Sequence, residues 1–145
     1  MIEKINEFGS LGEDELAAFE ATNHVRLPSD YRDFLLKFNG GKPNPNKNSN
    51  PETNITYILG MHNGDYYASL YKHIEMFKGR LPLSTFPIAT DPFGNLFLMS
   101  LHPEGYGNIY FWDHEGEPEF QDGHYTENCT FVAYTFDSFL KGLHW

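Results

Sequence analysis

The sequence has little cysteine and no long hydrophobic run. Its 145 residues include one cysteine, Cys129, which cannot form a disulfide within the chain and fits a reducing cytosol. No apolar stretch approaches the ~20 residues that a membrane-spanning helix needs. The first residues, MIEKINEF, lack the apolar core of a signal peptide. We therefore expect a cytoplasmic protein that does not bind membranes.

Basic residues are absent from residues 81–140. That stretch carries nine acids and no Lys or Arg, whereas residues 1–80 hold eleven acids and nine bases, and the whole chain has a net charge of −10. Such a stretch projects a negative field, which argues against a nucleic-acid partner and favours either a basic protein partner or simple solubility. The charge alone leaves both alternatives open.

Motifs for catalysis and metal binding are also missing. The histidines stand singly, without H-x-x-x-H or H-E-x-x-H spacing, and we interpret His114 and His124 as structural or solvent-facing. No serine lies in a G-x-S-x-G context, and no glycine-rich phosphate loop is present. The sequence therefore predicts a protein that is not an enzyme and that holds no metal and no cofactor.

Aromatic residues, in contrast, are abundant. The chain contains 13 Phe, 9 Tyr and 2 Trp. Because each ring buries a large apolar area, we expect a core built from rings rather than from an aliphatic layer. The length suits a single domain over residues 1–145, since a chain of this size buries roughly 70 % of the surface that its unfolded form exposes.

Residues 27–41, LPSDYRDFLLKFNGG, have the pattern of a well-capped amphipathic helix. Pro28 suits the first helical position, and Asp30 places a negative charge in the positive first turn. Apolar residues then recur at i, i+3, i+4 and i+7, and the final Asn-Gly-Gly tolerates the left-handed conformation that ends a helix. The predicted inner stripe consists of Tyr31, Phe34, Leu35 and Phe38.

Similar patterns predict the other elements. Ser10 and Glu13 have capping-box spacing before a short helix, Asp65 can cap a third helix, and Thr135 can cap a C-terminal one. Residues 42–54, with three prolines and five asparagines, are predicted to form a loop. Strands are predicted at residues 55–60, 85–90, 96–101, 108–113 and 130–134. Grouped rather than alternating helices and strands indicate an α+β fold, with a twisted, largely antiparallel sheet packed against N-terminal, middle and C-terminal helices.

The pattern of residues 27–41 also resembles the signature of the SUKH superfamily, the Smi/Knr-type domains known as bacterial immunity proteins and fungal cell-wall-assembly regulators. Later blocks follow in the family's order, so the resemblance covers nearly the whole chain except residues 42–54 and 116–124. The matching positions are Leu27, Pro28, Tyr31, Phe34, Leu35, Asn39, Gly40, Gly41, Ile88, Ala89, Gly94, Asn95, Trp112, Asp113, Phe136, Phe139 and Leu140.

This resemblance implies a Smi/Knr-type fold and a protein-binding function. The bacterial members imply an immunity protein that neutralises a toxin by binding it, and the fungal members imply, as the alternative, a regulatory interaction module. If the toxin is a nuclease, its basic substrate site can be blocked by an acidic patch that mimics nucleic acid. The densest acidic cluster, our candidate site for a basic toxin, consists of Asp113, Glu115, Glu117, Glu119 and Asp122. A competing hypothesis places the partner on the loop of residues 42–54.

Overall fold

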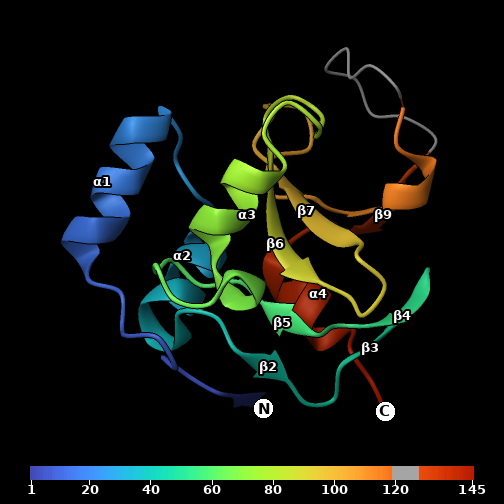
Figure 1. The fold of residues 1–145 in the computed structure, drawn as a ribbon, viewed down its shortest axis with the longest axis horizontal. Helices are drawn as coiled ribbons and strands as arrows, with labels where there is room; N and C mark the ends of the chain where they lie inside the picture. Colours follow the sequence, from blue (N-terminus) through green and yellow to red (C-terminus); the bar gives the residue numbers. More distant parts are fainter. Residues whose placement is uncertain (119–127) are drawn as a thin grey trace.

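A central antiparallel sheet organises the protein in a computed structural model that describes residues 1–118 and 128–145 (Figure 1). Its five strands lie side by side in chain order, each antiparallel to the next. They are β5 (Tyr57–Ile58), β6 (Thr85–Thr90), β7 (Leu96–Ser100), β8 (Ile109–Trp112) and β9 (Cys129–Ala133). Two small antiparallel pairs join β1 (Ile2–Glu3) to β2 (Lys42–Pro43) and β3 (Lys47–Ser49) to β4 (Glu52–Asn54).

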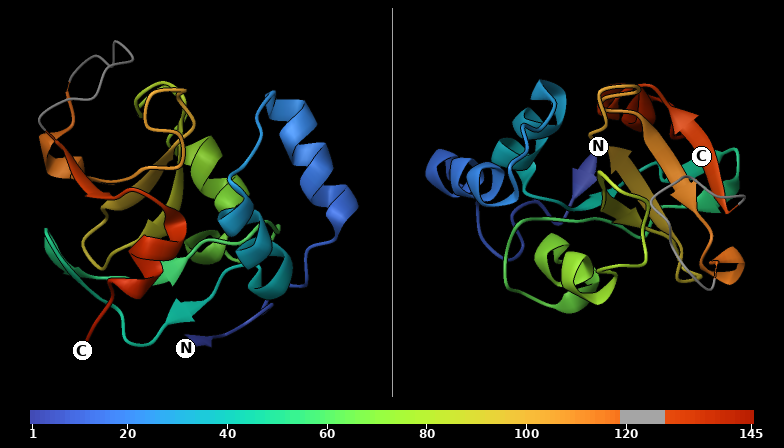
Figure 2. Two further views of the ribbon diagram at one scale, coloured as in Figure 1. Left: turned by 180° about the vertical axis from the view of Figure 1, so that it is seen from behind. Right: turned by 90° about the horizontal axis from the view of Figure 1, so that it is seen from above.

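Four helices surround this sheet in the described part of the chain. They are α1 (Glu13–Asn23), α2 (Ser29–Phe38), α3 (Leu70–Met76) and α4 (Phe136–Lys141), with short 3-10 turns at η1 (Tyr66–Ala68) and η2 (His114–Gly116). Figure 2 shows α2 and α4 on one side of the sheet and α3 on the other. The expected α+β fold with its N-terminal, middle and C-terminal helices is therefore confirmed.

Alternation along the strands divides the apolar residues between the two faces of the sheet. Phe97 and Phe111, paired across β7 and β8, belong to the large cluster that α2 and α4 cover. Their neighbours Leu98 and Trp112 point to the opposite face and are fully buried in a smaller cluster, against which Phe77 packs. The sheet thus has apolar cover on both faces.

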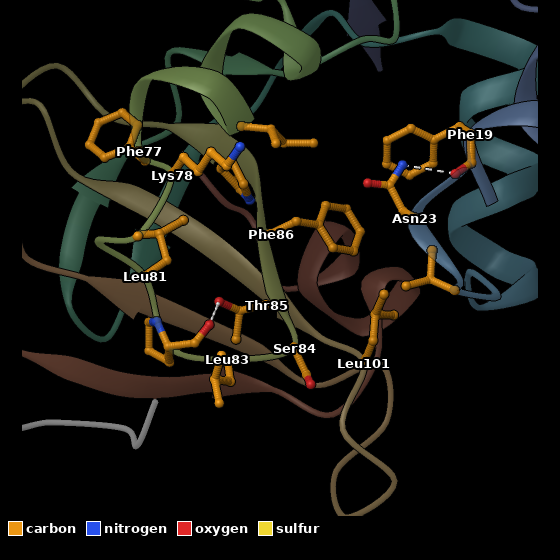
Figure 3. Close-up of a pocket in the computed structure, with 15 residues that line it drawn as sticks. Phe19, Asn23, Phe77, Lys78, Leu81, Leu83, Ser84, Thr85, Phe86 and Leu101 are labelled. Atoms are coloured by element: carbon orange, nitrogen blue, oxygen red, sulfur yellow. Dashed lines mark hydrogen bonds between the residues drawn. The ribbon is translucent and has the colours of Figure 1, made fainter. Parts of the chain in front are cut away.

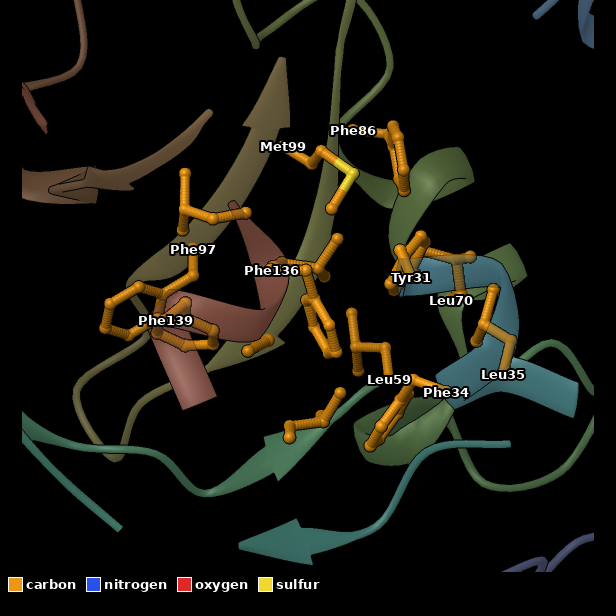
Figure 4. Packing of buried hydrophobic residues seen from close by; sticks show 14 of the residues in the cluster. Tyr31, Phe34, Leu35, Leu59, Leu70, Phe86, Phe97, Met99, Phe136 and Phe139 are labelled. Carbon is orange, nitrogen blue, oxygen red and sulfur yellow. The ribbon is translucent and has the colours of Figure 1, made fainter. Parts of the chain in front are cut away.

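The large cluster is rich in rings, as the composition predicted (Figure 4). The Phe136 ring centroid lies 5.0 Å from that of Tyr31 and 4.9 Å from that of Phe34. The Phe97 and Phe139 centroids lie 5.1 Å apart. These contacts join α2, α4 and β7, so aromatic packing connects the N-terminal and C-terminal parts of the chain.

Helix α2 confirms the predicted inner stripe and its C-terminal stop. Tyr31, Phe34 and Leu35 are buried, whereas Phe38 is only partly buried. Asn39 adopts the left-handed conformation at φ 42°, and its buried side chain accepts a hydrogen bond from the Met61 N–H at 2.8 Å and donates to the Met61 carbonyl at 3.1 Å. The asparagine therefore ends the helix and also ties it to the chain that follows β5.

The glycine after Asn39 is required by a close approach of two backbones. Gly40 has φ +89°, and a Cβ built there would lie 2.8 Å from the Gly60 nitrogen. Any side chain would collide with the backbone next to β5. This contact gives a physical reason for the N-G-G sequence at the end of the helix.

The capping predictions were right at one helix and wrong at two. Thr135 caps α4 through a reciprocal capping box with Ser138. At α1 the cap position is Gly12, with no side-chain cap, so the predicted Ser10 box does not form. Asp65 precedes η1, and α3 is instead capped by Ser69, whose hydroxyl accepts from the Lys72 N–H at 3.2 Å. Pro28 occupies the cap position of α2, one residue before the first helical position.

The predicted loop of residues 42–54 was the largest error. It contains β2 and the β3–β4 hairpin, in which Asn48 donates from its side chain to the Pro51 carbonyl at 2.8 Å. The Thr53 hydroxyl donates to the Asp91 carboxylate at 2.9 Å, which fastens the hairpin to the turn between β6 and β7. Polar contacts therefore hold this segment in place, whereas apolar burial stabilises the other elements. The first predicted strand is also shorter than expected, because only Tyr57–Ile58 pairs regularly.

None of the helices in residues 1–118 and 128–145 is long and apolar enough to cross a membrane.

Candidate functional site

The acidic cluster begins where β8 ends and passes through η2. Trp112 is fully buried, and Asp113 follows it at the surface, where its carboxylate accepts from the Glu115 N–H at 3.0 Å. The His114 N–H donates to the Asn95 side-chain oxygen at 3.1 Å. Trp112 therefore packs inward, while the polar side chain of Asp113 bonds the backbone of the turn. These bonds hold η2 against the turn between β6 and β7.

Glu117 does not present an unpaired charge, because it forms a bidentate ion pair with Arg80. The guanidinium donates from Nε to one carboxylate oxygen at 3.0 Å and from Nη2 to the other at 2.8 Å. These hydrogen bonds lower the pKa of the Glu117 carboxyl and raise the pKa of Arg80. Arg80 also lies over Phe77, 4.5 Å from the ring centroid, and 5.9 Å from that of Trp112.

The five predicted acids therefore differ in exposure and in ion pairing. Asp113 is half-buried and Glu115 is exposed, and neither forms an ion pair with another described residue. Glu117 is neutralised by a base that lies one residue before the base-free stretch. Glu119 and Asp122 lie outside the described residues. Within the described part, Asp113 and Glu115 are the acids of the cluster whose negative charge is not balanced by an ion pair.

The competing site, residues 42–54, presents an ordered polar surface. Ser49 shares a 2.7 Å hydrogen bond with the His144 ring, and Lys47 lies 4.0 Å from the Glu52 carboxylate. The hairpin therefore carries one charge of each sign, Lys47 and Glu52. It offers a partner hydrogen-bonding groups but no excess of positive or negative charge.

The structure also contains an apolar hollow that the sequence reasoning missed (Figure 3). It encloses about 320 Å³ between α1, the end of α3 and the start of β6, with Phe19, Ile74, Phe86 and Leu101 among its walls. Lys78 contributes its one charged side chain. These residues come from separate segments, and the faint apolar pattern of α1, where only Leu16 is fully buried, was the one available signal.

The chemistry of these surfaces suits binding. The lining of the hollow is mainly apolar, and its polar side chains are those of Asn23, Lys78, Ser84 and Thr85. Groups of three or more side chains able to hold a metal ion do not occur among residues 1–118 and 128–145. The described surfaces offer charge, apolar area and hydrogen bonds to a partner.

Comparison with known proteins agrees with the resemblance seen in the sequence. The sequence model of the SMI1 / KNR4 family (SUKH-1) matches residues 10–142, a range that contains every signature position named above. The chain is also similar to the SPbeta prophage-derived uncharacterized protein YokK of Bacillus subtilis (strain 168). The two are 29 % identical over an alignment of length 149, which covers 90 % of this chain and 73 % of the prophage-derived protein.

Proposed function

This chain belongs to the SMI1 / KNR4 family (SUKH-1), and from that premise we propose that it is a non-catalytic immunity protein, which neutralises a cognate toxin in the cytoplasm by binding it. The family match over residues 10–142 is the observation that carries the proposal. The similar Bacillus subtilis protein is prophage-derived, a setting that fits a role in conflict between genomes.

The proposed mechanism is occlusion of a basic surface on the toxin. The net charge of −10 attracts such a surface over a distance and speeds encounter. Asp113 and Glu115, fixed at the end of β8 and without an ion pair to any residue that the structure describes, then face the basic groups of the toxin. A nuclease fits this mechanism because it binds phosphates with basic residues, and an acidic protein seated there excludes the nucleic acid.

Coexpression with a neighbouring toxin gene tests the proposal. Where the adjacent gene encodes a protein with a toxic C-terminal domain, we expect this chain to restore growth and to form a stoichiometric complex in isothermal titration calorimetry. The Phe34→Ala variant serves as the control, because its lower stability should weaken rescue. A folded wild-type chain that neither rescues growth nor binds would contradict an immunity function and favour the regulatory interaction module.

A further inference from the structure

Exposed apolar side chains gather beside the acidic cluster, at one end of the sheet. Tyr66 is 63 % exposed, Tyr67 40 %, Met76 47 % and Phe93 71 %. We call these four residues the aromatic surface. Tyr66, Tyr67 and Met76 line a hollow of about 350 Å³ that the turn between β6 and β7, which carries Phe93, closes on the other side. Exposed apolar groups collected in this way mark interaction sites, whereas single ones do not.

The turn that carries Phe93 is held rigidly from inside. Asp91 is buried, and one of its oxygens accepts from the N–H groups of Phe93 and Asn95, both at 2.9 Å. The other oxygen accepts from the side chains of Asn95 and Thr53, again at 2.9 Å. A backbone turn held in place before binding loses little conformational freedom when a partner covers it.

The tyrosines of η1 are arranged in the same way. The Tyr67 hydroxyl donates to the Asp65 carboxylate at 2.9 Å, and its ring lies 6.0 Å from that of Tyr66 and 5.3 Å from that of Tyr57. Tyrosine is enriched among the few residues that carry most of the energy of an interface, because it buries a large rigid ring and keeps a polar group.

Acidic groups border the aromatic surface, and they outnumber the two bases near it. The bond between the His114 N–H and Asn95 places η2, with Asp113 and Glu115, next to the turn. Asp65 precedes η1, and Glu75 precedes Met76 in α3. The lining of the hollow itself contains no Lys or Arg, and the two bases near its tyrosines already have partners: Lys72 Nζ donates to the Gly64 carbonyl at 2.6 Å, and Lys42 Nζ lies 5.2 Å from the Tyr57 ring centroid. An apolar centre with an acidic border is complementary to a basic partner, whose Lys and Arg side chains can lay their stems on the rings.

We infer that the aromatic surface is the docking site for the basic toxin domain, with the rings supplying affinity and the bordering acids supplying steering. This inference rests on the proposed function and adds the face that the partner covers. It accounts for four of the eleven large apolar side chains that are exposed among the described residues.

Alanine variants at matched exposure test the inference. Phe93→Ala and Tyr66→Ala remove exposed rings of the aromatic surface. Leu83→Ala, at a residue 71 % exposed beside the other hollow, and Tyr134→Ala, at a residue 73 % exposed after β9, remove equally exposed groups elsewhere. All four should unfold thermally like the wild type, since each side chain is mostly in water.

The readout is the dissociation rate from the toxin that the wild-type chain neutralises. We expect Phe93→Ala and Tyr66→Ala each to weaken binding at least tenfold, mainly through faster dissociation, and the two controls to stay within twofold. Wild-type affinity for both variants of the aromatic surface would overturn the inference while leaving the immunity function intact. A wild-type chain that binds no neighbouring toxin would overturn both.

Discussion

At the scale of single residues, Tyr31 combines a signature position with an unsatisfied polar group. The side chain is fully buried between Phe86 and Phe136, and its hydroxyl has no hydrogen-bond partner among the described residues. Burial raises the pKa of Tyr31 far above its ordinary value, so the hydroxyl stays neutral. The ring therefore carries the packing, and the hydroxyl adds a desolvation cost.

We expect Tyr31→Phe to raise the free energy of unfolding by about 1 kcal/mol, because leaving a buried hydroxyl unpaired costs about 1–3 kcal/mol. Urea unfolding of the variant and the wild type measures the difference. Tyr31→Leu is the control, which should destabilise because it removes the ring contacts. If Tyr31→Phe lost more than about 1 kcal/mol, the hydroxyl would have to make a stabilising bond in solution.

His73 provides a prediction about pH. It is buried in α3, its Nδ1 lies 2.9 Å from the Ser69 carbonyl, and its ring stacks on Phe77. Burial lowers the pKa of His73 below its ordinary value. The unfolded chain therefore binds the proton more tightly, and stability falls as the pH drops below about 6.5, the ordinary pKa of histidine.

We expect His73→Gln to reduce the loss of unfolding free energy between about pH 7 and pH 5, because the amide cannot take up a proton in the unfolded chain. Denaturant unfolding at several pH values measures the slope. Replacement of the exposed His24 by Gln is the matched control for the loss of one histidine outside α3. An identical slope for His73→Gln and the wild type would show that another group, such as the half-buried His62, is responsible.

At the scale of elements, α2 is the helix on which the aromatic core depends. Phe34 is 5 % exposed and packs against Phe136 of α4 as well as Phe38. We expect Phe34→Ala to lower the free energy of unfolding by about 3–5 kcal/mol, because the truncation removes apolar contacts and leaves a cavity. Asp33→Ala, on the exposed side of the same helix, should stay within about 0.5 kcal/mol of the wild type. Equal stability of the two variants would contradict the packing of α2.

The same helix shows how far local sequence determines structure here. Its stripe and its left-handed stop are local properties, and both were predictable from residues 27–41. The β3–β4 hairpin was not predictable, because its anchors are distant: Thr53 bonds to Asp91, and Lys47 pairs with His144. A segment without an apolar period looks like a loop unless those partners are known.

The candidate site divides in the same way. Charge counting selected Asp113 and Glu115 as candidates, since an excess of one sign can be read from the sequence. It could not find the neutralisation of Glu117, because Arg80 lies 37 residues earlier and meets it only in the folded chain. The aromatic surface was missed for a similar reason. Phe93 and the η1 tyrosines belong to separate segments, and an aromatic residue in a sequence is ordinarily assigned to the core.

At the scale of the whole molecule, the negative charge is uneven and partly cancelled where it is densest. Arg80 lies on Phe77 and near Trp112, so it covers part of the smaller apolar cluster. Glu117 pairs with this arginine and so helps to hold it there. Glu115, two residues earlier, is exposed and unpaired among the described residues. Two acids of one cluster should therefore respond differently when their charge is reversed.

We expect Glu117→Lys to lower the free energy of unfolding by about 1 kcal/mol, the upper part of the range for a partly exposed ion pair, because it leaves Arg80 facing a second cation. The double variant Arg80→Glu with Glu117→Lys restores opposite charges and should recover part of the loss. Chemical denaturation of both variants measures the effect. Unchanged stability of the single variant would show that the pair contributes nothing in solution.

Glu115→Lys should instead leave stability unchanged and act on association. If the toxin is basic, this reversal removes an attractive charge and adds a repulsive one at the border of the aromatic surface, so the association rate falls and its dependence on salt weakens. Glu52→Lys on the β3–β4 hairpin is the matched control, since that acid is also exposed and the competing hypothesis places the partner there. Stopped-flow association at two salt concentrations separates the cases. An unaffected rate for Glu115→Lys, with a slower one for Glu52→Lys, would move the partner from the end of the sheet to the hairpin.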